Sequence, residues 1–113
     1  MRFKVYQDAK KFYHRIRKLT KSFPRECWEL GDQMRRSSLS VVLNIAEGAG
    51  KATDKEFNRY LVNSLGSINE TAAGIDVSCD ASLISVDEKD ALLKEAKSIA
   101  DQLGGFSKKL KSS

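Results

Sequence analysis

The chain has 113 residues, of which 41% are hydrophobic and 31% are charged, and its net charge is +5. This balance is typical of a soluble globular protein and excludes an intrinsically disordered chain. No apolar stretch approaches the roughly 20 residues of a transmembrane helix, and the N-terminus alternates charges where a secretory signal would be apolar. We therefore expect a cytoplasmic protein that forms a single domain over residues 1–113 and has no membrane contact.

The positive charge is concentrated in the first half of the chain. Residues 1–60 carry a net charge of +7, whereas residues 61–113 carry −2. A basic segment can attract a polyanion such as nucleic acid, although many solvated helices are basic and bind nothing. Cys27 and Cys79 are isolated thiols without the spacing of zinc ligands or of a disulfide framework. We expect no metal and no cofactor.

Residues 3–20 have the pattern of an amphipathic helix. Apolar residues recur at steps of four and three, which places them on one helical face: Val5, Ala9, Phe12, Ile16 and Leu19. The remaining faces are strongly basic and include Lys10, Lys11, Arg15, Arg17 and Lys18. Tyr6 and Tyr13 lie on the flank, where their rings would either stack on unpaired bases or pack at the edge of the core.

Pro24 ends this helix, and a second helix is predicted from near Cys27 or Leu30 to Ala46. Glycines follow at positions 48 and 50, and we expect both to close the helix as C-caps with positive φ. The second helix has two apolar faces separated by a polar seam, which consists of Arg36, Ser40, Asn44 and Glu47. This seam is either a binding site or a hydrogen-bonded network that fixes subunit register, and we favour the network.

A third helix is expected to begin at a capping box formed by Thr53 and Glu56 and to end near Cys79. Its core face is apolar, and the opposite face carries a ridge of small or apolar residues, namely Val62, Gly66, Ala73 and Val77. Such a ridge permits close approach of another chain, and we expect Glu70, beside it, to pair with helix two or with a neighbouring subunit.

A second capping box, Ser85 with Glu88, predicts a fourth helix that continues to about Leu110. Its apolar stripe is regular, although Gly104 and Gly105 should weaken its last turns. Four amphipathic helices joined by short loops predict an all-α, up-down-up-down antiparallel four-helix bundle.

Several segments resemble the bacterial four-helix-bundle family related to the intervening-sequence proteins of large-subunit ribosomal RNA genes. The matching segments are Leu19-Thr20, Phe23-Pro24, Gln33-Met34-Arg35-Arg36-Ser37-Ser38, Asn44-Ile45-Ala46-Glu47-Gly48, Lys55-Glu56-Phe57 and residues 64–70. One departure lies inside the motif, because this chain has Val41-Val42-Leu43 where the family commonly has Ile-Pro-Ser. Losing that proline should make the second helix more continuous.

The resemblance implies a homo-oligomer, specifically a pentameric ring, with a role in binding RNA or other nucleic acid. Residues Leu103-Gly104-Gly105-Phe106 are similar, more distantly, to accessory proteins of diversity-generating retroelements, which bind a reverse transcriptase and nucleic acid. Neither relative supplies a catalytic residue.

Three functional hypotheses remain at this stage. The first is a non-enzymatic nucleic-acid-binding oligomer whose predicted basic set is Lys10, Lys11, Arg15, Arg17, Lys18, Arg25, Arg35, Lys51, Lys55 and Arg59. The alternative is a protein-interaction adaptor that docks on a polymerase or another protein partner. An enzyme is disfavoured, because His14 is isolated and Arg36 is expected close to Glu47. The predicted assembly set comprises Arg36, Ser40, Asn44, Glu47, Gly48, Gly66, Ser67 and Glu70.

Overall fold

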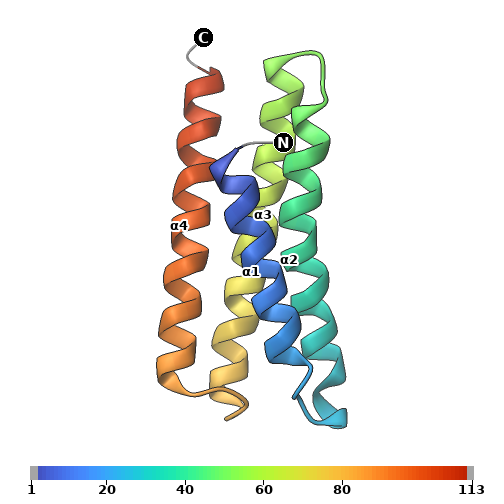
Figure 1. The fold of residues 1–113 in the computed structure, drawn as a ribbon, viewed down its shortest axis with the longest axis vertical. Coiled ribbons are helices and arrows are strands. Elements are labelled where there is room, and N and C mark those ends of the chain that lie inside the picture. The colour runs from blue at the N-terminus through green and yellow to red at the C-terminus, as the bar shows by residue number, and fades with distance from the viewer. Residues whose placement is uncertain (1–2, 112–113) are drawn as a thin grey trace.

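Residues 3–111 are described by a computed structural model and form four long helices in antiparallel order. The elements are α1 (Lys4–Thr20), a short 3-10 turn η1 (Arg25–Cys27), α2 (Trp28–Ala49), α3 (Asp54–Asp80) and α4 (Val86–Lys111). Figure 1 shows the chain running up and down along one long axis, with each helix beside its neighbour in sequence. The predicted all-α, up-down-up-down bundle is confirmed.

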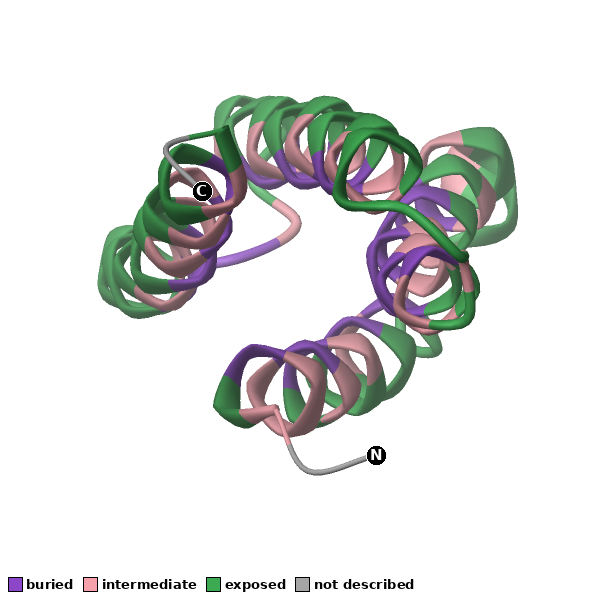
Figure 2. Ribbon diagram, turned by 90° about the horizontal axis from the view of Figure 1, so that it is seen from above, coloured by how far each residue is buried: buried purple, intermediate pink, exposed green. Residues whose placement is uncertain are grey.

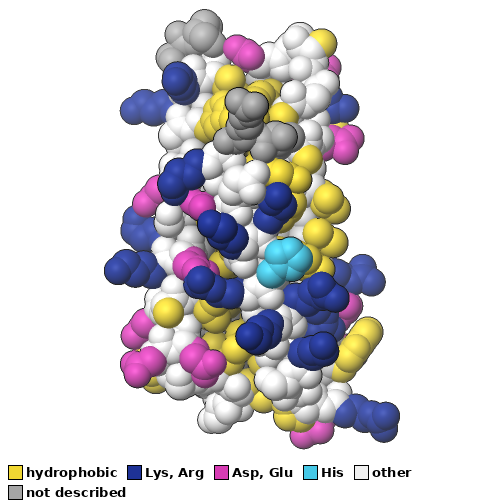
Figure 3. All heavy atoms as spheres, in the orientation of Figure 1, with side chains coloured by type: hydrophobic (Ala, Val, Ile, Leu, Met, Phe, Trp, Pro, Cys, Tyr) yellow, Lys and Arg dark blue, Asp and Glu magenta, His cyan; other side chains and the backbone are white. Residues whose placement is uncertain are grey.

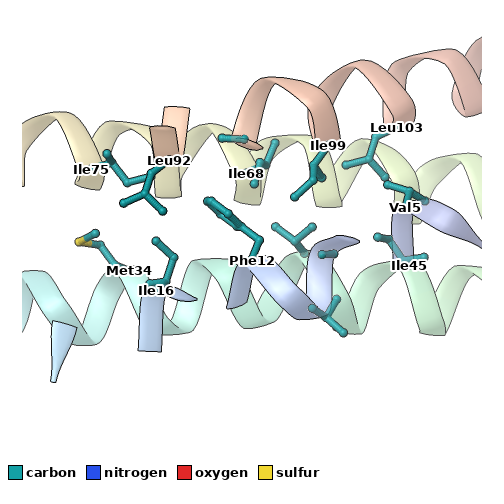
Figure 4. Packing of buried hydrophobic residues seen from close by; sticks show 14 of the residues in the cluster. Val5, Phe12, Ile16, Met34, Ile45, Ile68, Ile75, Leu92, Ile99 and Leu103 are labelled. Carbon is teal, nitrogen blue, oxygen red and sulfur yellow. The ribbon is translucent and has the colours of Figure 1, made fainter. Parts of the chain in front are cut away.

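The predicted apolar stripes meet in one continuous core. Figure 4 shows side chains from all four helices pointing into the same interior, among them Phe12, Met34, Ile68 and Ile99. These residues are almost completely inaccessible to solvent. Figure 2 shows the same arrangement from above, with the buried sides of the helices facing inward. Each apolar side chain that is fully removed from water contributes roughly 1.5–3 kcal/mol, so the stripes determine which face of each helix turns inward.

Both predicted capping boxes begin a helix. The backbone N–H of Glu56 donates to Thr53 Oγ1 at 3.2 Å, which starts α3. The backbone N–H of Glu88 donates to Ser85 Oγ, while the N–H of Ser85 donates to Glu88 Oε1. These bonds satisfy N–H groups that have no partner inside the helix.

Gly48 does not have the predicted role. It lies inside α2, which continues to Ala49, and no described glycine has a positive φ. Instead, a Cβ atom at position 48 would lie 2.7 Å from Tyr60 Cβ and 2.9 Å from Phe57 Cδ1. The glycine therefore allows α2 and α3 to approach closely, while Gly50 is the C-cap, with φ of −88°.

Gly104 and Gly105 lie inside α4, which runs unbroken to Lys111, so the weakening expected from these glycines does not end the helix. The second apolar face predicted for α2 belongs only in part to the core: Val42 is buried, whereas Leu43 is 56% exposed. A face predicted from periodicity alone thus divides between the core and the surface.

The helices form an arc whose two ends are α1 and α4 (Figure 2). The α2–α3 and α3–α4 pairings are extensive, whereas α1 and α4 touch much less than α1 and α2 do. Polar bridges connect α1 and α4: Arg15 forms an ion pair with Glu95, and Gln102 Nε2 donates to Asp8 Oδ2 at 3.0 Å.

Candidate nucleic-acid interface

Basic side chains gather where α1 ends and α2 begins. Arg17 and Lys18 project from the last turns of α1, Lys21 follows the helix, and Arg25 lies in η1; all four are exposed. In Figure 3, Lys and Arg side chains crowd the lower half of the face formed by α1 and the start of α2. The outward faces of two antiparallel helices and their connecting turn thus bring these charges together.

The same corner contains a pocket of about 550 Å³, which we call the corner pocket. Its lining includes five cationic side chains and no acidic one; the residues are His14, Arg17, Lys18, Thr20, Lys21, Phe23, Pro24, Arg25, Trp28, Gly31 and Arg35. Its volume falls in the range of roughly 300–1,000 Å³ that is common for small-ligand sites. The pocket is therefore suited by size and by charge to an anionic group.

Arg35 is fixed in place at this pocket. Its Nη1 donates to Thr20 Oγ1 at 2.9 Å, and Thr20 Oγ1 itself donates to the carbonyl of Ile16 at 2.8 Å. Gly31 leaves room for this guanidinium, because a Cβ there would lie 3.0 Å from Arg35 Nη1. The last turn of α1 is thus joined to α2 by a cation that also lines the pocket.

The other four cations of the corner are not neutralised by any side chain of residues 3–111. Within residues 3–111, Arg17, Lys18, Lys21 and Arg25 form no ion pair or side-chain hydrogen bond. Arg35 differs, because Asp32 lies 3.9 Å away in addition to the Thr20 bond. Charges that the chain leaves unneutralised are available to a ligand.

The rest of the predicted basic set does not form one surface with the corner. Lys51, Lys55 and Arg59 lie at the opposite end of α2, which has 22 residues and therefore spans about 33 Å. Lys51 Nζ and Arg59 Cζ lie 5.2 and 5.3 Å from the centre of the Tyr60 ring. Lys51 and Arg59 therefore share one aromatic partner, while Lys55 lines a separate pocket beside Asp54 and Asn58.

Along α1 itself, the predicted cations are partly engaged. Lys10 lies 4.9 Å from the ring centre of Tyr6, and Arg15 is paired with Glu95. Lys11 is exposed between α1 and α4. Tyr6 and Tyr13 are half-buried and pack against the core. Of the two roles considered for these rings, this is the packing at the edge of the core.

The sequence prediction missed two contributors to the corner, Trp28 and Lys21. Trp28 is the first residue of α2, is 60% exposed and lines the pocket. An exposed aromatic ring has no place in an apolar stripe, so periodicity gives no signal for it. The available clue was its position, four residues after Pro24 in a basic turn.

Of the four residues in the predicted polar seam, only Ser40 and Asn44 are hydrogen-bonded to each other. Asn44 Nδ2 donates to Ser40 Oγ at 3.0 Å, and Ser67 Oγ of α3 donates to the same oxygen at 2.9 Å. Arg36 instead binds Asp32, with 3.0 Å from Nε to Oδ2, and Glu47 lies 3.8 Å from Lys51. The expected proximity of Arg36 and Glu47 is therefore wrong, because each pairs with a residue four positions away in the sequence.

Additional small polar residues extend this α2–α3 contact. The hydroxyls of Ser37 and Thr71 lie 2.6 Å apart, and Ser64 Oγ donates to the carbonyl of Val41 at 2.9 Å. All three hydroxyl groups belong to buried residues. We use the name α2–α3 seam for the contact formed by Ser37, Ser40, Asn44, Gly48, Ser64, Ser67 and Thr71. Its polar side chains bind one another or backbone carbonyls, and Ser40, Asn44 and Ser67 are only partly buried.

The small or apolar residues Val62, Gly66, Ala73 and Val77, which we call the α3 ridge, are on the surface, as expected. Val62 and Val77 are each 49% exposed, and a Cβ at Gly66 would meet nothing within 4 Å. Glu70 is also exposed and makes no ion pair within residues 3–111. Its predicted partner on helix two is therefore absent from the described part of the chain.

Other kinds of site have little support in the described residues. Residues 3–111 contain no group of three His, Cys, Asp or Glu side chains arranged to hold a metal, and Cys27 and Cys79 are free thiols. None of the described helices combines the length and the apolarity that a membrane crossing requires. Asp8 has a lowered pKa, because hydrogen bonds from Lys4 and Gln102 stabilise its charged form against partial burial.

The fold and its surface define a helical-bundle protein with a polar, tightly packed seam and a cationic corner. The chain belongs to the 23S rRNA-intervening sequence protein family, whose model matches residues 1–105. The resemblance seen in the sequence is thereby confirmed.

A solved structure supports the same architecture. The chain is similar to a protein of unknown function from the S23 ribosomal protein family of Bacteroides thetaiotaomicron, with a TM-score of 0.86 and 23% identity. The match covers 92% of this chain and 95% of the other. No curated protein sequence matches the chain. Neither the family description nor that of the solved structure names an enzymatic activity.

Proposed function

We propose that this protein is a non-enzymatic nucleic-acid-binding protein and that RNA binds to the basic face of α1 and to the corner pocket. One observation carries the proposal: five cations surround a pocket without an acidic side chain in its lining. Four of them lack a partner within residues 3–111. Backbone phosphates are the ligands that such a set neutralises best, because binding releases condensed counterions.

Salt dependence tests this proposal. The anisotropy of a short, fluorescently labelled single-stranded RNA should rise on addition of the protein, and affinity should fall steeply between about 50 and 200 mM salt. Lys18→Ala combined with Lys21→Ala should reduce the slope of log affinity against log salt by about one for each lysine. Lys94→Ala with Lys108→Ala removes the same charge from exposed positions of α4 and should have a smaller effect. Absence of binding at low salt would refute the proposal.

The second part of the proposal is self-association through the α3 ridge. Half-exposed valines beside a glycine with open space around it allow two backbones to approach closely. In a homo-oligomer, of which a pentameric ring is the form expected from the family resemblance, weak phosphate contacts are repeated around the assembly and reinforce one another.

Sedimentation tests the assembly. Val62→Glu should reduce the oligomer mass, because a charge would be buried in an apolar contact, while Lys94→Glu on α4 should leave it unchanged. Glu47→Ala is also expected to disturb assembly more than binding, since Glu47 is exposed near the end of α2. A wild-type protein that sediments as a monomer would contradict self-association and would favour the adaptor alternative, in which the ridge contacts a different protein.

The proposal that this protein is not an enzyme rests on the partners and the exposure of its polar side chains. The seam hydroxyls bind each other or backbone carbonyls, and Glu47 is exposed beside Lys51. General acid–base chemistry needs titratable groups that converge in a pocket. His14, the only histidine, lies among cations in the corner pocket without a carboxylate in its lining.

A further inference from the structure

We propose that the corner pocket is a subsite for one unpaired nucleotide, with its phosphate among the cations and its base stacked on Trp28. This inference rests on the proposed function and deepens it, because it distinguishes single-stranded from double-stranded nucleic acid. It also assigns separate roles to the aromatic and the basic residues of the pocket.

The position of Trp28 is the first argument. This indole is 60% exposed and takes no part in the core cluster, whereas the other aromatic residues with apolar rings, such as Phe12, Phe57 and Phe106, pack in or against it. A large ring at the wall of a cationic pocket offers a flat face to a planar partner. Stacking of bases on aromatic side chains is a general means of holding single strands.

The arrangement of the cations is the second argument. Arg17, Lys18 and Lys21 come from the end of α1, and Arg25 comes from η1, so positive charge approaches the pocket from two sides. The acidic residues of the same segment, Glu26 and Glu29, do not line the pocket. A phosphate attached to the stacked nucleoside would therefore meet cations and no carboxylate.

The pocket also discriminates by shape. Its volume of about 550 Å³ is on the scale of one small ligand. Bases of a duplex already stack on their neighbours, and only an unpaired base can turn its face toward a protein ring. A duplex would reach the surface cations, but it would not reach the Trp28 face.

Intrinsic fluorescence provides a direct test, because Trp28 is the only tryptophan in the chain. Titration with an unlabelled single-stranded RNA should quench the Trp28 emission in step with binding measured by anisotropy. The same RNA annealed to its complement should bind with little quenching. The sequence of the strand should matter little, since every base presents a stackable face.

Matched substitutions separate stacking from charge. Trp28→Leu should weaken single-strand binding by about 5- to 160-fold and leave duplex binding unchanged, so that the preference for single strands disappears. Trp28→Phe should restore most of the affinity, because it retains an aromatic face. Position 28 is mostly exposed, so both variants should keep the helical circular dichroism spectrum of the wild type.

Three results would overturn the inference. If RNA raises the anisotropy without quenching Trp28, the proposed function stands and the corner subsite does not. If neither signal changes at low salt, both proposals fail. If an acidic peptide of equal charge quenches Trp28 as strongly as RNA does, the pocket binds anions without base stacking, and a protein partner takes the place of the nucleotide.

Discussion

The α2–α3 seam and the corner pocket use polar residues in opposite ways. In the seam, hydroxyl groups bind each other at short range, as Ser37 does with Thr71 and Ser67 with Ser40. In the corner, Arg17, Lys18, Lys21 and Arg25 make no ion pair within residues 3–111. Buried polar groups without partners are costly, whereas charges in water are not, so only the corner can leave its groups free for a ligand.

The family resemblance covers the two regions differently. The segment Asn44-Ile45-Ala46-Glu47-Gly48 supplies seam residues: Asn44 Nδ2 donates to Ser40 within α2, and Gly48 lets α2 approach α3 closely. At the corner, Thr20, Phe23, Pro24 and Arg35 lie in matching segments, whereas Trp28 and Lys21 lie outside them. The resemblance therefore reaches the pocket, but it does not include the ring that we propose as the stacking face. Three substitutions test the contrast, and a fourth tests the contact between α1 and α4.

Gly48→Ala should have the largest effect, because its Cβ would lie 2.7 Å from Tyr60 Cβ. That atom is attached to the α3 backbone and cannot move aside without the helix. Overpacking of this kind costs about 1–3 kcal/mol, which should exceed the roughly 1 kcal/mol gained in helix propensity. Urea denaturation measures the difference in the free energy of unfolding. Gly105→Ala, where a Cβ meets nothing within 4 Å, should instead be stabilising, and equal effects at both sites would contradict the seam account.

Arg35→Met should affect both properties, since Arg35 joins the corner to the bundle. The variant loses the bond to Thr20, which should lower stability by about 1 kcal/mol because Thr20 keeps its bond to Ile16. It also removes one cation from the pocket, so RNA affinity should fall as well. Denaturation and anisotropy on the same preparation measure the two losses, and unchanged affinity would exclude Arg35 from the interface.

Thr71→Val should affect only the seam. The substitution keeps the shape of the side chain and removes its hydrogen bonds to Ser37 and to the carbonyl of Ser67, each at a cost of about 0.5–1.5 kcal/mol. Ser37 retains a bond to the carbonyl of Met34, which limits the loss. RNA affinity measured well below the unfolding temperature should equal that of the wild type. A large loss of affinity would show that the seam and the corner are coupled.

Asp8→Asn should have the smallest effect, because surface ion pairs contribute less than about 1 kcal/mol. Bonds from Lys4 and Gln102 lower the Asp8 pKa below its usual 3.8. The ionised group therefore stabilises the fold above that value, and the stabilisation is lost as pH falls through the lower, folded-state pKa. Thermal melts should show the variant slightly less stable than the wild type at neutral pH and equal to it in strong acid. A difference that grows in acid would contradict this assignment.

The sequence predicted the structural features that depend on the residues of a single helix. The stripe from Val5 to Leu19 and the Thr53–Glu56 cap follow from helical period and local hydrogen bonding, and both appear in the fold. Gly48 was misassigned as a cap, because its purpose is the approach of Tyr60 from another helix. Trp28 was missed because an exposed ring leaves no periodic signal. Contacts between helices and isolated surface groups are thus the information that the pattern lacks.

Hydrogen–deuterium exchange with and without single-stranded RNA tests the central claim most directly. Amides of α2 and α3 along the seam should exchange slowly in both states, because their helices are packed closely. Added RNA should slow exchange in the segment that runs from the end of α1 through η1 to the first turn of α2. Protection confined to the Lys51–Arg59 end, or no protection at all, would contradict the assignment of the corner as the nucleic-acid site.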